Sequence, residues 1–133
     1  MTESMCSTKT ERAVATLKQI RQAVIQLTEW NADKQSADDF MTSPEGMKDL
    51  AASSMLVEAI GEGFKNVDKL TDGQLLPLRQ EIPWKEVKGI RDKIAHGYFD
   101  IDADIIFESV KFELPELLPA IDFFIEHLTK AGL

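Results

Sequence analysis

The chain has 133 residues, 44% hydrophobic and 29% charged, which predicts one folded domain over residues 1–133, with residues 1–7 disordered. A single cysteine excludes an internal disulfide. No apolar run approaches the roughly 20 residues that span a bilayer, and the N-terminus is polar, so we predict a cytoplasmic protein without membrane contact. The net charge of −8 argues against strong non-specific binding to nucleic acid, because that affinity needs basic side chains.

The first helix is expected to begin near Thr8, where Thr8 and Glu11 have the spacing of a capping box. Apolar residues then recur every three or four positions up to about Ala32, as in an amphipathic helix: Val14, Leu17, Ile20, Val24 and Leu27. A short helical turn can follow from Ser36.

A second helix is expected from Ser43-Pro44, with serine as the N-cap and proline in the first helical position, to about Thr71. Its apolar residues occupy more than one face, and they are Met47, Leu50, Ala51, Met55, Val57, Ile60, Phe64 and Val67. This distribution predicts a central, well-buried helix.

The third helix is predicted from about Pro83 to His96, and it ends at Gly97. The last helical stretch, 103–130, begins after Asp102 as N-cap and contains Pro115, where we expect a kink or break. Long helices with short loops and no period-two strand pattern predict an all-α fold, an antiparallel up-and-down bundle of four to five helices.

The third helix lies in the most basic segment of the chain, residues 79–96. At 100° per residue Arg91 lies beside the apolar stripe of this helix, so its guanidinium needs an acidic partner, and Glu62 is one candidate. Asp92 and His96 are four residues apart and can meet on the outer face. One interpretation is structural: Arg91 pairs with an acid and only holds two helices together.

Residues 82–102 contain more distinctive residues than Arg91, Asp92 and His96 alone. The segment contains Pro83, Trp84, Arg91, Asp92, His96, Tyr98 and Asp102. This string closely resembles the signature of the HepT-like branch of the HEPN superfamily: an arginine, a following Asn or Asp, a histidine five residues after the arginine, and a tyrosine two further on. Ile60-Gly61-Glu62 also looks like the family pattern, and the resemblance spans roughly residues 12–128 in element order.

The resemblance implies an all-helical, usually homodimeric protein. Many members are metal-independent endoribonucleases and act as the toxin of a toxin–antitoxin pair. The partner is typically a small nucleotidyltransferase of the MNT type, which can attach AMP to the tyrosine of the motif, here Tyr98. A purely structural interpretation of Tyr98 is a ring that covers the end of the bundle.

The residue chemistry is compatible with metal-independent RNA cleavage. His96 can act as acid or base on the ribose 2′-OH or the leaving oxygen, Arg91 can hold the scissile phosphate, and Asp92 can orient His96. Because each chain has one such histidine, two motifs brought together in a dimer would supply both an acid and a base.

Lys88 and Lys93 can add phosphate contacts. We expect no metal and no cofactor, since His96 and His127 are the only histidines and fall on different predicted helices. Two alternatives remain open: a non-catalytic helical dimer that binds a nucleotidyltransferase partner or a nucleotide, which the charge of −8 favours, and a purely structural bundle.

Overall fold

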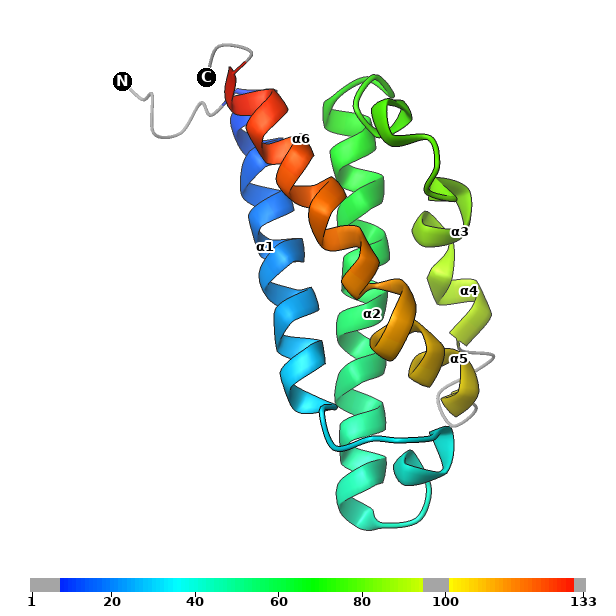
Figure 1. Cartoon of the computed structure of the whole chain (residues 1–133). Helices are drawn as coiled ribbons and strands as arrows, with labels where there is room; N and C mark the ends of the chain where they lie inside the picture. The colour runs from blue at the N-terminus through cyan, green and yellow to red at the C-terminus, as the bar shows by residue number, and fades with distance from the viewer. Residues whose placement is uncertain (1–7, 95–100, 131–133) are drawn as a thin grey trace.

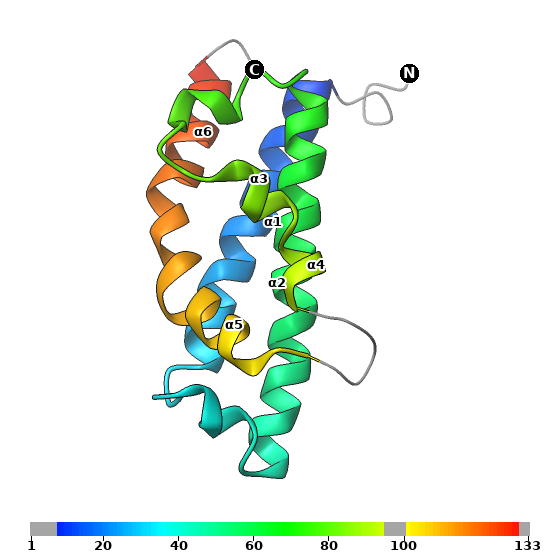
Figure 2. The ribbon, with the colours of Figure 1, turned by 90° about the vertical axis from the view of Figure 1, so that its right-hand side faces the viewer.

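The computed structural model describes residues 8–94 and 101–130, so the predicted disorder of residues 1–7 falls outside the described residues. The secondary structure there is built from helices (Figure 1). Two long helices, α1 (Lys9–Trp30) and α2 (Pro44–Leu70), run antiparallel, and α6 (Leu118–Lys130) packs along α1. The short helices α3 (Trp84–Lys88) and α4 (Ile90–Ile94) pack on the side of α2 that faces the viewer in Figure 2. The predicted all-α fold is confirmed.

Both predicted starts of the long helices are confirmed. The Thr8 hydroxyl accepts the Glu11 N–H at 3.0 Å, while the Glu11 carboxylate accepts the Thr8 N–H at 2.9 Å. The Ser43 hydroxyl accepts the Gly46 N–H at 2.9 Å, with Pro44 in the first turn. Each cap satisfies backbone N–H groups that a helix leaves unpaired, so local chemistry fixes where both helices begin.

The hydrophobic core lies between α1, α2 and α6 and is closed on one side by Trp84. The Trp84 ring lies 5.0 Å from the Phe64 ring and 5.7 Å from the Phe124 ring, measured between centroids. Its indole N–H donates to the Arg79 carbonyl at 3.0 Å, which satisfies the one polar atom of the side chain. Trp84 therefore ties the segment after α2 to the core.

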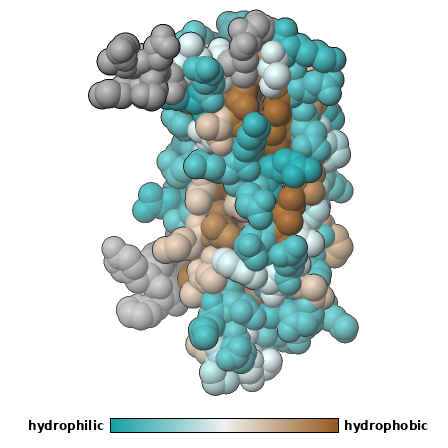
Figure 3. Space-filling model, turned by 90° about the vertical axis from the view of Figure 1, so that its left-hand side faces the viewer, coloured by the Kyte–Doolittle hydropathy of each residue, from teal (hydrophilic) through white to brown (hydrophobic). Residues whose placement is uncertain are grey.

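The predicted central position of α2 is confirmed, since it packs against α1 and against the short helices that follow it, but not all of its predicted apolar residues are buried. Met47 and Met55 are 54% and 73% exposed, and Ala51 between them is exposed as well. These three residues are four apart, so they form one outward stripe, whereas Leu50, Val57 and Phe64 face the core. Elsewhere on the molecule, Figure 3 shows apolar surface in patches between hydrophilic side chains.

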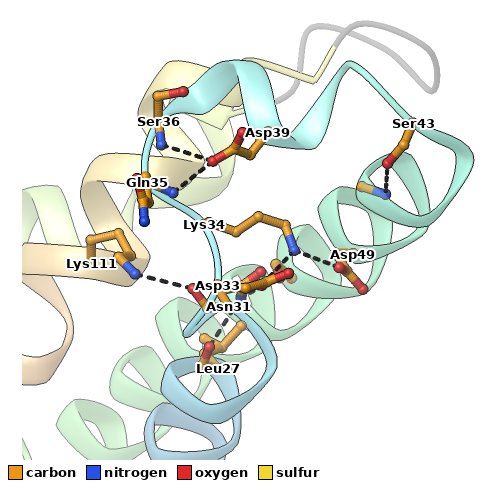
Figure 4. Close-up of polar contacts among 12 residues, drawn as sticks. Leu27, Asn31, Asp33, Lys34, Gln35, Ser36, Asp39, Ser43, Asp49 and Lys111 are labelled. Carbon is orange, nitrogen blue, oxygen red and sulfur yellow. Dashed lines mark hydrogen bonds and ion pairs between the residues drawn. The ribbon is translucent and has the colours of Figure 1, made fainter.

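A polar cluster fixes the connection from α1 to α2, which includes the short 3-10 helix η2 (Ala37–Phe40) (Figure 4). Lys34 is only 4% exposed, and its ammonium donates to Asp49 at 2.6 Å and to Asp33 at 3.0 Å. The Lys111 ammonium, 80 residues further along the chain, donates to the Asn31 carbonyl at 3.1 Å. The connection is thus held by α2, through Asp49, and by the segment before Pro115, through Lys111.

The predicted break near Pro115 is confirmed, and it begins earlier than the proline. The chain passes from α5 (Ala103–Glu108) through a π-helical turn, η4 (Ser109–Glu113), and a 3-10 turn, η5 (Pro115–Leu117), into α6. Proline lacks an N–H and its ring clashes with the carbonyl four residues back, so the preceding turn widens. The predicted Asp102 cap is also confirmed, since its carboxylate accepts the Ile105 N–H at 3.1 Å.

None of the helices in the described ranges is both long and apolar enough to cross a bilayer. With α3 (Trp84–Lys88) and α4 (Ile90–Ile94) counted as one interrupted helix, the described residues form five α-helices, within the predicted four to five.

Candidate functional site

The motif helix is not continuous, contrary to the prediction of one helix over 83–96. It is divided into α3 and α4 at Gly89, whose N–H donates to the Lys85 carbonyl at 3.1 Å. Gly89 has φ −99° and ψ 14°, outside the helical region, and the Asp92 N–H then bonds back to its carbonyl in a tighter turn. Glycine has a poor helix propensity, which favours an interruption of the helix at this position.

The α3–α4 segment packs closely against α2 at Gly61. A Cβ atom added to Gly61 would lie 2.8 Å from the Ile90 Cγ2 and 3.0 Å from the Val87 carbonyl oxygen. Only a residue without a side chain permits this approach. Gly61 therefore sets how closely the α3–α4 segment packs on α2, and at which turn of α2 the contact lies.

Arg91 contacts a different acid from the one expected. Its Nε lies 3.6 Å from the Glu58 Oε1, whereas Glu62 pairs with Lys65 at 3.2 Å. The two segments run antiparallel (Figure 1), so residues after the Gly61 contact on α4 lie opposite the preceding turn of α2, where Glu58 is. The predicted Arg91–Glu62 pair is wrong for this reason.

The environment of Arg91 is open. Its side chain is 68% exposed, and the expectation that it lies at the edge of the core is wrong. Within residues 8–94 and 101–130 it makes no hydrogen bond within 3.5 Å, and its one ion pair is long. Exposed pairs of this kind contribute roughly 0–1 kcal/mol. Its pair with Glu58 therefore contributes little to holding α4 on α2.

The two lysines proposed to bind substrate are in different places. The Lys88 ammonium donates to Asp68 at 2.9 Å, with both side chains about one-third exposed or less. Lys93 is exposed and lies about 200° around the helix from Arg91, so it faces the other side of α4. Asp92 is exposed beside Arg91. The structure therefore groups neither lysine with Arg91.

His96 and Tyr98 lie outside the described residues, so their predicted roles stay predictions. The chain is described again from Ile101, and the Asp102 N–H donates to the Ile94 carbonyl at 3.0 Å. This bond joins the two ends of the segment that carries both residues.

Sequence reasoning missed a groove of about 560 Å³ on the Lys93 side of α4. Its floor is apolar, from Ile60 of α2, Ile90 of α4 and Leu117 of η5, and its rim carries four glutamates with one arginine and one lysine. The residues come from three segments far apart in the chain, so no local pattern could have indicated the groove.

One rim pair is internally neutralised. The Arg79 Nε donates to the Glu81 carboxylate at 2.7 Å, and this hydrogen bond lowers the pKa of Glu81 below its usual value. The Arg79 guanidinium also lies 5.4 Å from the centre of the Phe123 ring. The other rim glutamates, Glu86, Glu113 and Glu116, make no ion pair with described residues.

The structure, a helical bundle with an exposed arginine on a short broken helix docked at a glycine of α2, is consistent with the class of HEPN-like helical domains. The family model described as "Ribonuclease HepT-like" matches residues 10–123, which include the whole motif segment. The chain belongs to the HepT-like family. No solved structure gives a significant match.

Curated relatives agree with this family. A protein named "Putative RNase" from Caldanaerobacter subterraneus subsp. tengcongensis is 37% identical over 82 residues, covering 62% of this chain and 67% of the relative. A "Probable ribonuclease HepT" from Thermococcus cleftensis is 38% identical over 61 residues, covering 46% and 52%. A "Putative RNase" from Methanocaldococcus jannaschii is 35% identical over 72 residues, covering 54% and 59%. The matches thus span about half to two thirds of these relatives.

Proposed function

We propose that the protein is a metal-independent endoribonuclease that uses Arg91 and His96. The observation that carries the proposal is the state of Arg91: in a chain of the HepT-like family, this motif arginine is 68% exposed, and with residues 8–94 and 101–130 it makes only a 3.6 Å ion pair. A residue that held helices together would be closely paired. An open guanidinium instead suits a phosphate, which it can bind through two parallel hydrogen bonds.

The proposed reaction uses motif residues alone, contributed by two copies of the chain. His96 of one copy takes the proton of the ribose 2′-OH and the 2′ oxygen bonds to phosphorus, while the bond to the 5′ oxygen breaks as that oxygen takes a proton from protonated His96 of the second copy. Arg91 stabilises the charge that develops on the phosphate oxygens. Asp92, which is next to Arg91 in sequence and exposed, would orient His96. The products are a cyclic phosphate and a 5′-hydroxyl end.

A homodimer is part of the proposal, because one motif has one histidine and the reaction needs both a base and an acid. The exposed stripe on α2, Met47, Ala51 and Met55, supports it. Met55 precedes Glu58 by three residues, so the stripe continues on the same helix face to the acid that pairs with Arg91. A second copy seated on this stripe would bring two arginine motifs near each other.

We further propose control by a partner nucleotidyltransferase of the MNT type, with the protein as the toxin of a toxin–antitoxin pair. An AMP group on Tyr98 would bring a phosphate to the motif that competes with RNA for Arg91. Intact mass of the protein expressed with and without such a partner tests this step directly.

The test of cleavage uses purified wild type, Arg91→Ala and His96→Ala on bulk transfer RNA with EDTA present. The proposal expects cyclic phosphate ends from wild type and their loss in both variants. Intact mass first confirms that Tyr98 is unmodified. Equal cleavage by wild type and both variants would reject the assignment of the two residues, and activity that EDTA abolishes would reject metal independence.

The second candidate is a non-catalytic helical dimer that binds a nucleotidyltransferase partner or a nucleotide. The net charge of −8 favours it, since a nuclease gains affinity from basic surface. Absence of cleavage by unmodified wild type, together with binding of the partner, would support this second function.

A further inference from the structure

We propose that the groove behind α4 is a docking site for a partner protein, and that it receives an apolar segment flanked by lysine or arginine residues. The groove has a volume of about 560 Å³, within the range of sites that hold a small ligand or a few side chains. It lies on the Lys93 face of α4, whereas Arg91 points to the Glu58 side. The proposed docking site therefore does not require that the protein cleaves RNA.

The floor of the groove determines the apolar part of the occupant. Val57 and Ile60 of α2, Val87 and Ile90 of the motif segment, and Leu117 of η5 line it. Of these, Val87 and Ile90 are only partly buried, so the floor leaves apolar surface in contact with water. An apolar side chain that displaced this water would gain free energy in proportion to the area covered.

The rim determines the charge of the occupant. Arg79 neutralises Glu81 at 2.7 Å, which leaves Glu86, Glu113 and Glu116 against Lys93. Glu113 is oriented by the Ser109 hydroxyl, which donates to its Oε1 at 3.2 Å from the π-helical turn. An anionic occupant such as RNA would be repelled by this rim, whereas a cationic segment is attracted to it.

Occupation of the groove would also act on the motif. One wall of the groove is the α3–α4 segment itself, two five-residue helices that are divided at Gly89 and rest on α2 at Gly61. A partner bound there would contact the motif segment on the face opposite Arg91. A partner in the groove would thus contact the motif segment without covering Arg91.

The experiment selects ligands from a display library of random short peptides on the full-length protein. We expect the selected peptides to carry one or two large apolar residues flanked by lysine or arginine. A synthetic peptide from this set should shift the methyl NMR signals of Ile60, Ile90 and Leu117. The same peptide with glutamate in place of its basic residues should not bind.

Two variants, one at the rim of the groove and one away from it, distinguish binding in the groove from a general effect of negative charge. Glu113→Gln/Glu116→Gln removes two rim charges without a change of shape, and it should weaken the selected peptide about tenfold. Glu29→Gln removes a charge from the exposed end of α1, away from the groove, and should leave the affinity unchanged.

Three results would overturn the proposal: no enriched peptide, enriched peptides without basic residues, or binding that leaves the groove methyl signals unmoved. A single-stranded RNA oligonucleotide that shifts the same methyl signals, and binds more tightly to the Glu113→Gln/Glu116→Gln protein, would instead assign the groove to nucleic acid. Circular dichroism of each variant confirms that it is folded.

Discussion

Lys34 and Arg91 carry the same charge in opposite surroundings. The Lys34 side chain is 4% exposed and bonds to two carboxylates at 2.6 and 3.0 Å, whereas Arg91 is 68% exposed with one carboxylate at 3.6 Å. The first arrangement stabilises the junction between α1 and α2. The second contributes little to the fold through the residues that the structure describes, so the contrast separates a cation that holds the structure from one that we propose meets a ligand.

The two regions also differ in how they are built. The junction joins two long, capped helices of 22 and 27 residues, while the motif rests on two helices of five residues each. Short helices contribute little stability of their own and depend on tertiary packing. The motif segment is therefore positioned by α2 rather than by its own helical structure.

The largest expected effect comes from Arg91→Ala, which should lower RNA cleavage about 10²–10³-fold, since the proposed phosphate ligand is lost. Its free energy of unfolding should change by less than about 0.5 kcal/mol, because the ion pair it removes is exposed and long. Arg91→Lys keeps the charge without the two-pronged geometry, so it should recover only part of the rate. Cleavage assays and urea denaturation measure the two quantities. A large loss of stability would show that Arg91 holds the fold after all.

Lys34→Ala should show the reverse pattern. The free energy of unfolding should fall by about 2–3 kcal/mol, because the change leaves Asp49 unpaired and a void where the buried stem was. Cleavage per folded molecule should stay the same. Lys18→Ala, on an exposed face of α1, is the control and should change stability by less than about 0.5 kcal/mol. Equal effects of the two variants would contradict a structural role for Lys34.

Gly61→Ala tests whether α2 positions the motif. The added methyl would lie 3.0 Å from the Val87 carbonyl oxygen, a backbone atom that can move less easily than a side chain. The free energy of unfolding should therefore fall by about 1 kcal/mol, although alanine has the better helix propensity. Cleavage should fall as well, because α3–α4 is displaced. Gly63→Ala is the matched control: its methyl meets only side-chain atoms of Ile20 and Thr16 on α1, and cleavage should be retained. Unchanged cleavage in Gly61→Ala would show that the motif tolerates displacement.

The smallest effect concerns pH. Burial opposes the charge of Lys34, but the hydrogen bonds that its ammonium donates to Asp49 and Asp33 outweigh this effect, so the pKa of Lys34 lies above its usual value. A raised pKa stabilises the fold below the unfolded value, and this contribution is lost as pH rises through the folded one. The Lys34 hydrogen bond lowers the pKa of Asp33 below 3.8, so that contribution is lost only in acid.

The difference in unfolding free energy between wild type and Lys34→Ala should accordingly be constant across neutral pH and shrink in strong base and strong acid. Urea denaturation over a pH series measures it. A difference that changed steadily through neutral pH would point to another titrating group.

The starts of the long helices, the break near Pro115 and the family can all be read from the amino-acid sequence. Capping residues, proline and the 82–102 motif act through local chemistry, which is readable without knowledge of neighbours. Tertiary structure alone decided that Glu58 rather than Glu62 meets Arg91, that Met47 and Met55 are exposed, and that a carboxylate-rimmed groove lies behind α4. Each of these depends on how segments distant in the chain pack together; for the Arg91 pair, the close contact of Gly61 with Ile90 sets the register between the antiparallel segments.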